Sequence, residues 1–253
     1  MNISSHKMDT RLIFRALMDI LLPRTCAVCQ CRLNVHENHI CLRCRSDLPL
    51  TRFWSLGHNP MADRFNELLQ DRMESFQPYA HAAALFYYKE DGLYRHIPHR
   101  LKYHGDIAIG RHFGKILGRE ISKSELFRDA DIIVPVPLHW TRKWKRGYNQ
   151  AEILARSAAQ EAGMQTRTDI LRRVRRTKTQ TRVGINDKAA NVHGAFQARI
   201  KKPDTLNGIR HVILIDDVFT SGSTALACFT ALRKVFPPDV RISVATLAFV
   251  GGR

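Results

Sequence analysis

Two adjacent carboxylates, Asp216 and Asp217, follow an apolar run at residues 212–215 and precede a stretch of small, mostly hydroxyl-bearing residues. Small residues at the start of a helix leave backbone N–H groups free to bind phosphate, and the helix dipole adds to the attraction. Carboxylates only accept hydrogen bonds, so sugar hydroxyls or a divalent metal ion are their natural partners. The pattern predicts a site for a phosphorylated sugar. Its phosphate would be held by Thr220, Ser221, Gly222, Ser223 and Thr224.

An apolar strand that ends in Asp is also typical of P-loop NTPases, which need the sequence G-x-x-x-x-G-K-[ST] elsewhere in the chain. The Gly114–Lys115 pair is followed by isoleucine, and no glycine stands at the required distance before it. The sequence therefore excludes a P-loop NTPase. A packing role for two consecutive acids at a strand end remains as the other interpretation.

Five of the six cysteines lie between residues 26 and 44. CAVC and CLRC form two C-x-x-C pairs separated by eleven residues, an arrangement that favours a tetrahedral zinc site. Free thiols or an oxidised redox pair are the alternatives. A module this small has too little core to fold alone, so a structural metal would supply its stability. The predicted ligands are Cys26, Cys29, Cys41 and Cys44.

Apolar segments alternate with helical patterns from about residue 80 onward. Strands are expected at 81–89, 131–139, 211–218 and 240–250, and helices at 91–103, 110–121, 149–163 and 223–235. This alternation predicts an α/β fold with a parallel sheet and helices on both faces. Ligands bind beyond the carboxyl ends of such strands, where the two acids fall. We expect a helix and metal module at 1–50, a connector at 51–79 and the α/β domain at 80–253.

Two segments combine many basic residues, and the first is also rich in aromatic residues. HWTRKWKRGYNQ (139–150) places Trp140 and Trp144 among four cations, and RRVRRTKTQTR (172–182) has no acid. Bases of single-stranded nucleic acid stack on aromatic side chains while cations follow the backbone. Tryptophans packed back on the domain, and a solvated basic arm, are the alternatives. The candidate nucleic-acid residues are Arg142, Lys143, Trp144, Lys145, Arg146, Arg172, Arg173, Arg175 and Arg176.

The formal net charge is +17, from 40 basic and 23 acidic residues. Such a field attracts polyanions. No stretch reaches the roughly 18 apolar residues needed to span a bilayer, and residues 12–22 are interrupted by Arg15 and Asp19. No secretory signal pattern is found. We expect a cytoplasmic protein, in which disulfides are rare.

The segment 212–224 resembles the phosphoribosyl-pyrophosphate (PRPP) motif of type I phosphoribosyltransferases, with Phe219 where a smaller aliphatic residue is usual. The double C-x-x-C module, LKYHGD (101–106), residues 134–155 and this motif, in that order, resemble the ComF/GntX family. The resemblance implies that the two acids bind the ribose hydroxyls, that residues 220–224 hold the 5′-phosphate, and that Mg²⁺ accompanies PRPP. It implies that LKYHGD is a loop facing pyrophosphate. Its contributing residues would be Lys102, Tyr103 and Gly105.

Between Gln180 and Phe196 the family tends to carry an arginine three residues before the asparagine matched by Asn191, and this chain has Lys188 there. Lysine keeps the charge but loses the bidentate geometry of arginine.

The resemblance implies a competence-type protein that binds PRPP and single-stranded DNA, in natural transformation or in the use of DNA as a nutrient. A DNA translocase, a helicase or a recombination factor is the expected protein partner. The alternative is an active phosphoribosyltransferase, which would transfer the pentosyl group to an acceptor. No residue can be assigned as catalytic, and the sequence identifies no acceptor.

Overall fold

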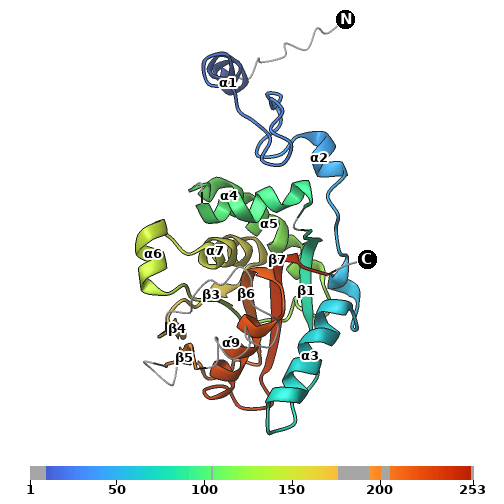
Figure 1. Cartoon of the computed structure of the whole chain (residues 1–253), viewed down its shortest axis with the longest axis vertical. Helices are drawn as coiled ribbons and strands as arrows, with labels where there is room; N and C mark the ends of the chain where they lie inside the picture. The colour runs from blue at the N-terminus through green and yellow to red at the C-terminus, as the bar shows by residue number, and fades with distance from the viewer. Residues whose placement is uncertain (1–9, 90, 104, 176–193, 201–205, 252–253) are drawn as a thin grey trace, which may run out of the picture.

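The structure is a computed structural model of the chain, and it describes residues 10–89, 91–103, 105–175, 194–200 and 206–251 (Figure 1). The side chains are described from residue 16 onward. The helices and strands of the α/β domain surround one buried core, and the cysteine-rich segment lies at one end of the molecule (Figure 1).

A five-stranded parallel sheet forms the centre of the α/β domain. Its order is β1-β7-β6-β2-β3, with every neighbouring pair parallel. The strands are β1 (Ala82–Tyr87), β2 (Ile132–Pro135), β3 (Gln165–Thr166), β6 (His211–Phe219) and β7 (Arg241–Phe249). β6 and β7 are almost wholly buried and mostly apolar, as expected for central strands covered on both faces. The predicted parallel sheet is confirmed.

Helices cover both faces of this sheet (Figure 1). On one face α5 (Ile107–Lys123) packs against α7 (Gln150–Ala162), and on the other face α3 (Pro60–Arg72) packs against α9 (Ser223–Arg233). Gly114 and Gly118 allow a very close approach between α5 and α7, since a Cβ on Gly118 would lie 2.5 Å from the carbonyl oxygen of Ala158.

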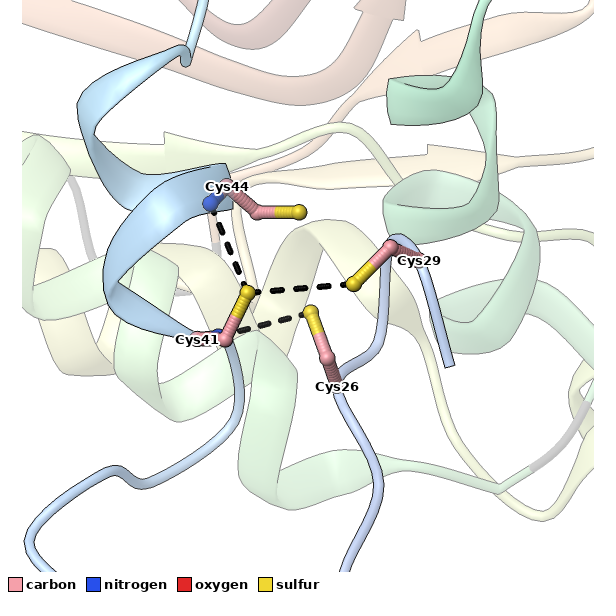
Figure 2. Close-up of side chains that lie close together, drawn as sticks. All are labelled: Cys26, Cys29, Cys41 and Cys44. Carbon is pink, nitrogen blue, oxygen red and sulfur yellow. Dashed lines mark hydrogen bonds between the residues drawn. The ribbon is translucent and has the colours of Figure 1, made fainter. Parts of the chain in front are cut away.

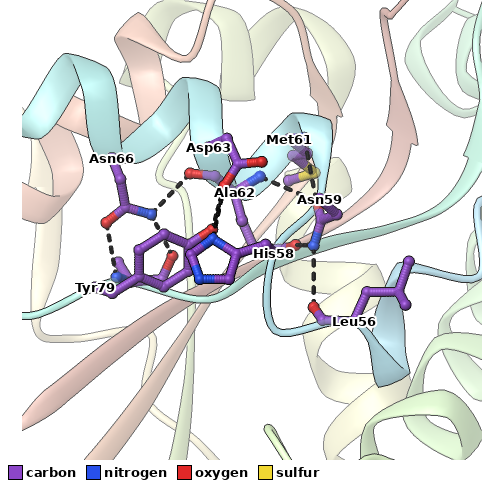
Figure 3. Close-up of polar contacts among 10 residues, drawn as sticks. Leu56, His58, Asn59, Met61, Ala62, Asp63, Asn66 and Tyr79 are labelled. Atoms are coloured by element: carbon purple, nitrogen blue, oxygen red, sulfur yellow. Dashed lines mark hydrogen bonds and ion pairs between the residues drawn. The ribbon is translucent and has the colours of Figure 1, made fainter.

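The predicted connector at 51–79 contains ordered structure that the sequence did not indicate, namely a 3₁₀ turn (Phe53–Ser55) and α3. Asn59 caps α3 by accepting hydrogen bonds from the N–H groups of Met61 and Ala62, and its amide donates to Ala82 of β1 (Figure 3). Asn66 exchanges hydrogen bonds with the backbone of Ala80. These buried amides fix α3 against the edge strand.

The remaining elements are short, and two of them change the sequence expectations. The helix expected at 91–103 is a 3₁₀ turn (Leu93–Arg95) followed by α4 (His96–Tyr103), so Lys102 and Tyr103 lie in the last turn of a helix rather than in a loop. The basic aromatic segment forms α6 (Trp140–Arg146). A separate antiparallel pair joins β4 (Leu171–Arg173) to β5 (Phe196–Ala198) beside α9.

The N-terminal segment contains α1 (Thr10–Leu21) and α2 (Leu42–Ser46). It contacts the α/β domain where the Tyr94 hydroxyl donates to the carbonyl oxygen of Cys44 at 3.0 Å, and where the rings of His39 and His112 lie 5.1 Å apart. Among the described residues, no helix is both long and apolar enough to cross a bilayer.

Candidate functional site

A cavity of about 1080 Å³ opens beyond the carboxyl ends of β2 and β6. It brings together residues that the sequence assigned to two different ligands. From the sugar phosphate set it includes Lys102, Tyr103, Gly105, Asp216, Asp217 and Thr224. From the nucleic-acid set it includes Arg142, Lys145, Arg146 and Arg173.

The two acids lie on opposite faces of β6, because consecutive residues of a strand point to opposite sides. Asp217 is 8% exposed and faces α4, where the Nζ of Lys102 lies 2.7 Å from its Oδ2. Asp216 faces the start of α9 and lies beside Thr224 and Thr246. Its Oδ1 accepts a hydrogen bond from the N–H of Asp217 at 2.8 Å. Both carboxylates also line the large cavity, so a ligand there can reach both.

The charges at this strand end depend strongly on one another. Burial and then the charge of Asp217 raise the pKa of Asp216 to about 8, against the opposing effects of the Asp217 N–H and of Lys102. Burial is the largest single effect on Lys102 and disfavours its charge, but the charge of Asp217, the hydrogen bond to Asp217 and the charge of Asp216 together raise the lysine pKa. The family resemblance implied that Lys102 faces pyrophosphate, whereas here its ammonium group pairs with Asp217.

The stretch 220–224 turns from β6 into α9, and Gly222 is the N-cap of that helix. Gly222 has φ +82°, and a Cβ there would lie 2.6 Å from a methyl carbon of Leu68 and 2.8 Å from the ring of Phe219. Packing inside the protein therefore requires glycine here, whereas the sequence pattern placed Gly222 among the residues that would hold the phosphate. Phe219 is buried against Phe65 and Phe249, which explains the large residue at its position.

The hydroxyl groups of this stretch have different surroundings. The Oγ atoms of Ser221 and Ser223 lie 2.9 Å apart, and the exposed Thr220 accepts a hydrogen bond from Arg64 at its carbonyl oxygen. No side chain caps α9, so its first N–H groups remain available as donors. A small cavity of about 20 Å³ lies between Thr220, Gly222, Thr224 and Asp216.

Helix α6 carries its cations and its tryptophans on opposite sides. The helical repeat places Arg142, Lys145 and Arg146 on one side, and these three line the cavity. Trp140 and Trp144 lie on the other side and are 71% and 88% exposed. The alternative in which the tryptophans pack back on the domain is therefore wrong.

No side chain of α6 is buried. The helix is held by polar and capping contacts, which include His139 at its N-cap, Gly147 at its C-cap and an ion pair of 3.6 Å between Lys143 and Glu152. Arg146 lies 5.1 Å above the ring of Tyr103. The position of helix α6 is consequently set by charge more than by packing.

The second basic segment is only partly described. Arg172 donates to Gln197 at 2.9 Å, and Arg173 lies over the ring of Phe196 and lines the cavity. Burial lowers the pKa of Arg173, and the nearby charge of Arg142 lowers it further. Arg175 is exposed. Arg176, the rest of this run, Lys188 and Asn191 lie outside the described residues.

Several cavity residues were missed by sequence reasoning, above all Gln150 at the start of α7. Gln150 is 4% exposed, lines the cavity, and its Nε2 has no hydrogen-bond partner among the described residues. The neighbouring Asn149 donates from its amide to the carbonyl oxygen of Val136 at 3.0 Å, and the Tyr148 hydroxyl donates to Leu101. The signal in the sequence was a polar Tyr-Asn-Gln run directly before an alanine-rich helix.

The sulfur atoms of Cys26, Cys29, Cys41 and Cys44 all lie within 4.8 Å of one another (Figure 2). Backbone N–H groups of Val28 and Cys41 point at the Cys26 sulfur at 3.4 Å, which suits a thiolate. Hydrogen bonds from the backbone and then the side chain of Cys31 lower the pKa of Cys29 to about 6. The predicted set is thus a cluster at metal-binding distance.

Comparisons with known proteins connect the chain to DNA-related proteins. No family model matches. The chain is 30% identical over 146 residues to competence protein F of Haemophilus influenzae, covering 56% of this chain and 63% of that protein. It is 33% identical over 129 residues to the DNA utilization protein YhgH of Salmonella typhimurium, covering 50% of this chain and 55% of that protein. The matched part is thus somewhat more than half the length of these relatives.

Other matches are shorter or weaker. The bifunctional protein PyrR of Corynebacterium diphtheriae is 41% identical over 68 residues, which is 27% of this chain and 35% of that protein. Among solved structures, a glutamine PRPP amidotransferase from B. subtilis aligns with 54% of this chain and 25% of its own, at a TM-score of 0.35 and 18% identity. The resemblance predicted from the sequence is confirmed by the curated relatives: this chain is a homologue of competence protein F and of the YhgH DNA utilization proteins.

Proposed function

We propose that this protein binds PRPP with Mg²⁺ in the large cavity, binds single-stranded DNA at α6, and acts in natural transformation or in the use of DNA as a nutrient. The observation that carries the proposal is the cavity itself, in which paired strand-end acids face a cationic helix that exposes two tryptophans. The curated relatives are named for competence and for DNA utilization, which supports a DNA-related role.

PRPP would bind across the ends of β6 and α9. Asp216 and Asp217 would accept hydrogen bonds from the ribose hydroxyls, and the free N–H groups at the start of α9 would hold the 5′-phosphate. The cations of α6 would face the pyrophosphate. Mg²⁺ fits this donor set, because it is commonly bound by one or two carboxylates together with substrate phosphates. When bound, it would neutralise charge on the diphosphate.

Single-stranded DNA would contact the exposed side of α6. Stacking of a base on a tryptophan contributes about 1–3 kcal/mol in single-strand binding proteins. Trp140 and Trp144 are exposed enough for such stacking, and the net charge of +17 attracts the backbone. A cytoplasmic location, and a DNA translocase, helicase or recombination factor as partner, follow from this role and belong to the proposal.

Two double variants, each measured with both ligands, test the proposed PRPP site and the proposed DNA surface separately. We expect Asp216→Asn combined with Asp217→Asn to weaken PRPP binding at least tenfold in calorimetry while oligonucleotide affinity stays within twofold. Trp140→Ala combined with Trp144→Ala should weaken oligonucleotide binding at least tenfold while PRPP affinity stays within twofold. Asp71→Asn on α3 and Phe76→Ala, both exposed and neither lining the cavity, are the matched controls. If each pair of changes weakened both ligands equally, the assignment of separate surfaces would be wrong.

Phosphoribosyl transfer is the second candidate function, and the size of the cavity favours it. The space leaves room for an acceptor beside PRPP. An acceptor atom would form a bond to the anomeric carbon while the bond to pyrophosphate breaks, and pyrophosphate would leave with the electron pair. Release of pyrophosphate that depends on an added acceptor separates this enzyme from a binding protein.

We also propose that the cysteine cluster holds a structural zinc ion. Four thiolates complete a tetrahedral site, which leaves no open position for catalysis. Cys26→Ser should remove the bound zinc and unfold the module, whereas Cys31→Ser should keep one zinc per chain, since Cys31 is outside the set of four. Elemental analysis after purification measures this, and equal zinc in both variants would contradict the ligand set.

A further inference from the structure

We propose that the cavity also binds the terminal phosphate of a DNA strand, at the first turn of α7 beside Gln150. This inference rests on the proposed strand binding and names the part of the strand that enters the protein. No pattern in the sequence assigned a role to Gln150.

The Gln150 side chain supplies the first argument. It is 96% buried, it lines the cavity, and its Nε2 group has no hydrogen-bond partner among the described residues. A buried amide donor without a partner destabilises the protein. A ligand that places an oxygen acceptor at this point would satisfy the donor.

The N-terminus of α7 supplies the second argument. The helix has 13 residues, and Asn149 at its N-cap makes no capping bond, because its amide group is turned away to the carbonyl oxygen of Val136. The first N–H groups of the helix and its dipole therefore favour an anion at the same point as Gln150. The two features together describe a recess for an anionic oxygen.

The charge of the cavity supplies the third argument. Among the described residues that line it, five are basic and two are acidic, and Asp216 tends to be protonated at neutral pH because its pKa is raised to about 8. The volume of about 1080 Å³ lies at the upper end of ordinary ligand cavities. Charge and space are thus sufficient for a second anionic group besides a sugar phosphate.

The two sides of α6 show how a strand could continue out of the cavity. Arg142, Lys145 and Arg146 line the cavity, while Trp140 and Trp144 on the opposite side are exposed. A strand whose end lies against α7 would pass the cations and then reach the tryptophans, on which the following bases stack. This path uses both faces of the helix.

A strand end fits this arrangement better than the middle of a strand. A phosphate monoester carries nearly two negative charges at neutral pH, as a phosphorylated side chain does. An internal phosphodiester carries one charge, and the chain would have to pass through the cavity on both sides of it. The terminal phosphate can enter alone.

Binding of matched oligonucleotides, measured by fluorescence anisotropy, tests the inference. The set shares one sequence and carries a 5′-phosphate, a 3′-phosphate or no terminal phosphate, and a circular form has no end. We expect one of the two phosphorylated forms to bind about tenfold more tightly than the unphosphorylated and circular forms. Equal affinity of all four forms would overturn the proposal.

Variants of α7 test the residue. Gln150→Leu removes the donor and Gln150→Glu repels the phosphate, so both should abolish the preference while leaving the affinity for the unphosphorylated strand unchanged. Gln160→Leu, exposed on the same helix, should keep the preference. A preference that survives both Gln150 changes overturns the assignment.

Inorganic pyrophosphate distinguishes a strand end from a free phosphate. It should compete with the phosphorylated strand and leave the unphosphorylated strand bound. Pyrophosphate binding that depends on Gln150, without any preference for phosphorylated ends, would mean that a free phosphate is the occupant and would overturn the proposal. PRPP binding, measured separately with Asp216→Asn, shows whether the proposed sugar phosphate site fails independently.

Discussion

The end of β6 and the helix α6 line one cavity, but they are built in different ways. Asp217 is on a central strand bonded to a neighbour on each side, its carboxylate pairs with Lys102, and the following turn packs against Phe219. Helix α6 buries no side chain and is held by its caps and by charged contacts. The acids therefore belong to the rigid core, whereas the cations can adjust to a ligand.

The fixed acids of β6 and the exposed cations of α6 also recognise different features of a ligand. A buried carboxylate that is fixed in place recognises hydroxyl positions. A cationic helix on the surface recognises charge, and its contribution falls with added salt. We expect the β6 end to choose the small ligand and α6 to set the strength of polyanion binding.

The largest expected effect is a loss of stability when Gly222 is replaced with alanine, compared with the same change at Gly147. Gly222→Ala at the β6 end adds backbone strain and a clash with Leu68, so we expect a loss of about 2–5 kcal/mol in the free energy of unfolding. Gly147→Ala at the C-cap of α6 has a similar φ, but its Cβ meets no atom within 4 Å, so about 1–2 kcal/mol is expected. Urea unfolding compares them, and equal losses would mean that the two regions are equally rigid.

The pH dependence of ligand binding should come next in size. Because the pKa of Asp216 is raised to about 8, its carboxyl group is mostly protonated at pH 7, and both of its oxygens become acceptors for sugar hydroxyls only when it loses the proton. Affinity for PRPP with Mg²⁺ should therefore rise between pH 7 and 9, by at most about tenfold per pH unit. Lys102 stays charged there, since its pKa is raised.

Asp216→Asn should flatten this profile in calorimetry. The same raised pKa means that Asp216 binds more protons in the folded protein than in the unfolded chain between about pH 4 and 8. The contribution of Asp216 to stability should consequently fall with rising pH across that window. A wild-type affinity that does not change from pH 7 to 9 would contradict the role of Asp216.

The smallest effect concerns salt. Replacing Lys145 and Arg146 with alanine should reduce the slope of log affinity against log salt for an oligonucleotide by about 0.7 for each lost phosphate contact. Lys234→Ala, exposed at the end of α9, is the control and should leave the slope unchanged. An unchanged slope in the double variant would show that the strand does not use the cavity side of α6.

Local patterns predicted most of the fold and the identity of many cavity residues. Apolar runs of strand length gave the sheet, and the C-x-x-C spacing gave the cysteine cluster. Helix α3 was missed because its turns mix polar residues with the core positions, so Asn59 and Asn66 carry a role that only their tertiary partners reveal. The family resemblance implied that LKYHGD (101–106) is a loop, whereas Lys102 and Tyr103 lie in the last turn of α4.

The amino-acid sequence by itself determined that two acids follow the apolar run of a buried strand, that four cysteines can meet, and that a basic aromatic segment precedes an alanine-rich helix. These are local patterns, and the backbone periodicity fixes their consequences. Only the tertiary structure decided that Lys102 pairs with Asp217, that the cations of α6 share a cavity with those acids, and that Gln150 faces the same space. Such relations join residues on different elements, and the packing of helices on the sheet sets the distances between them.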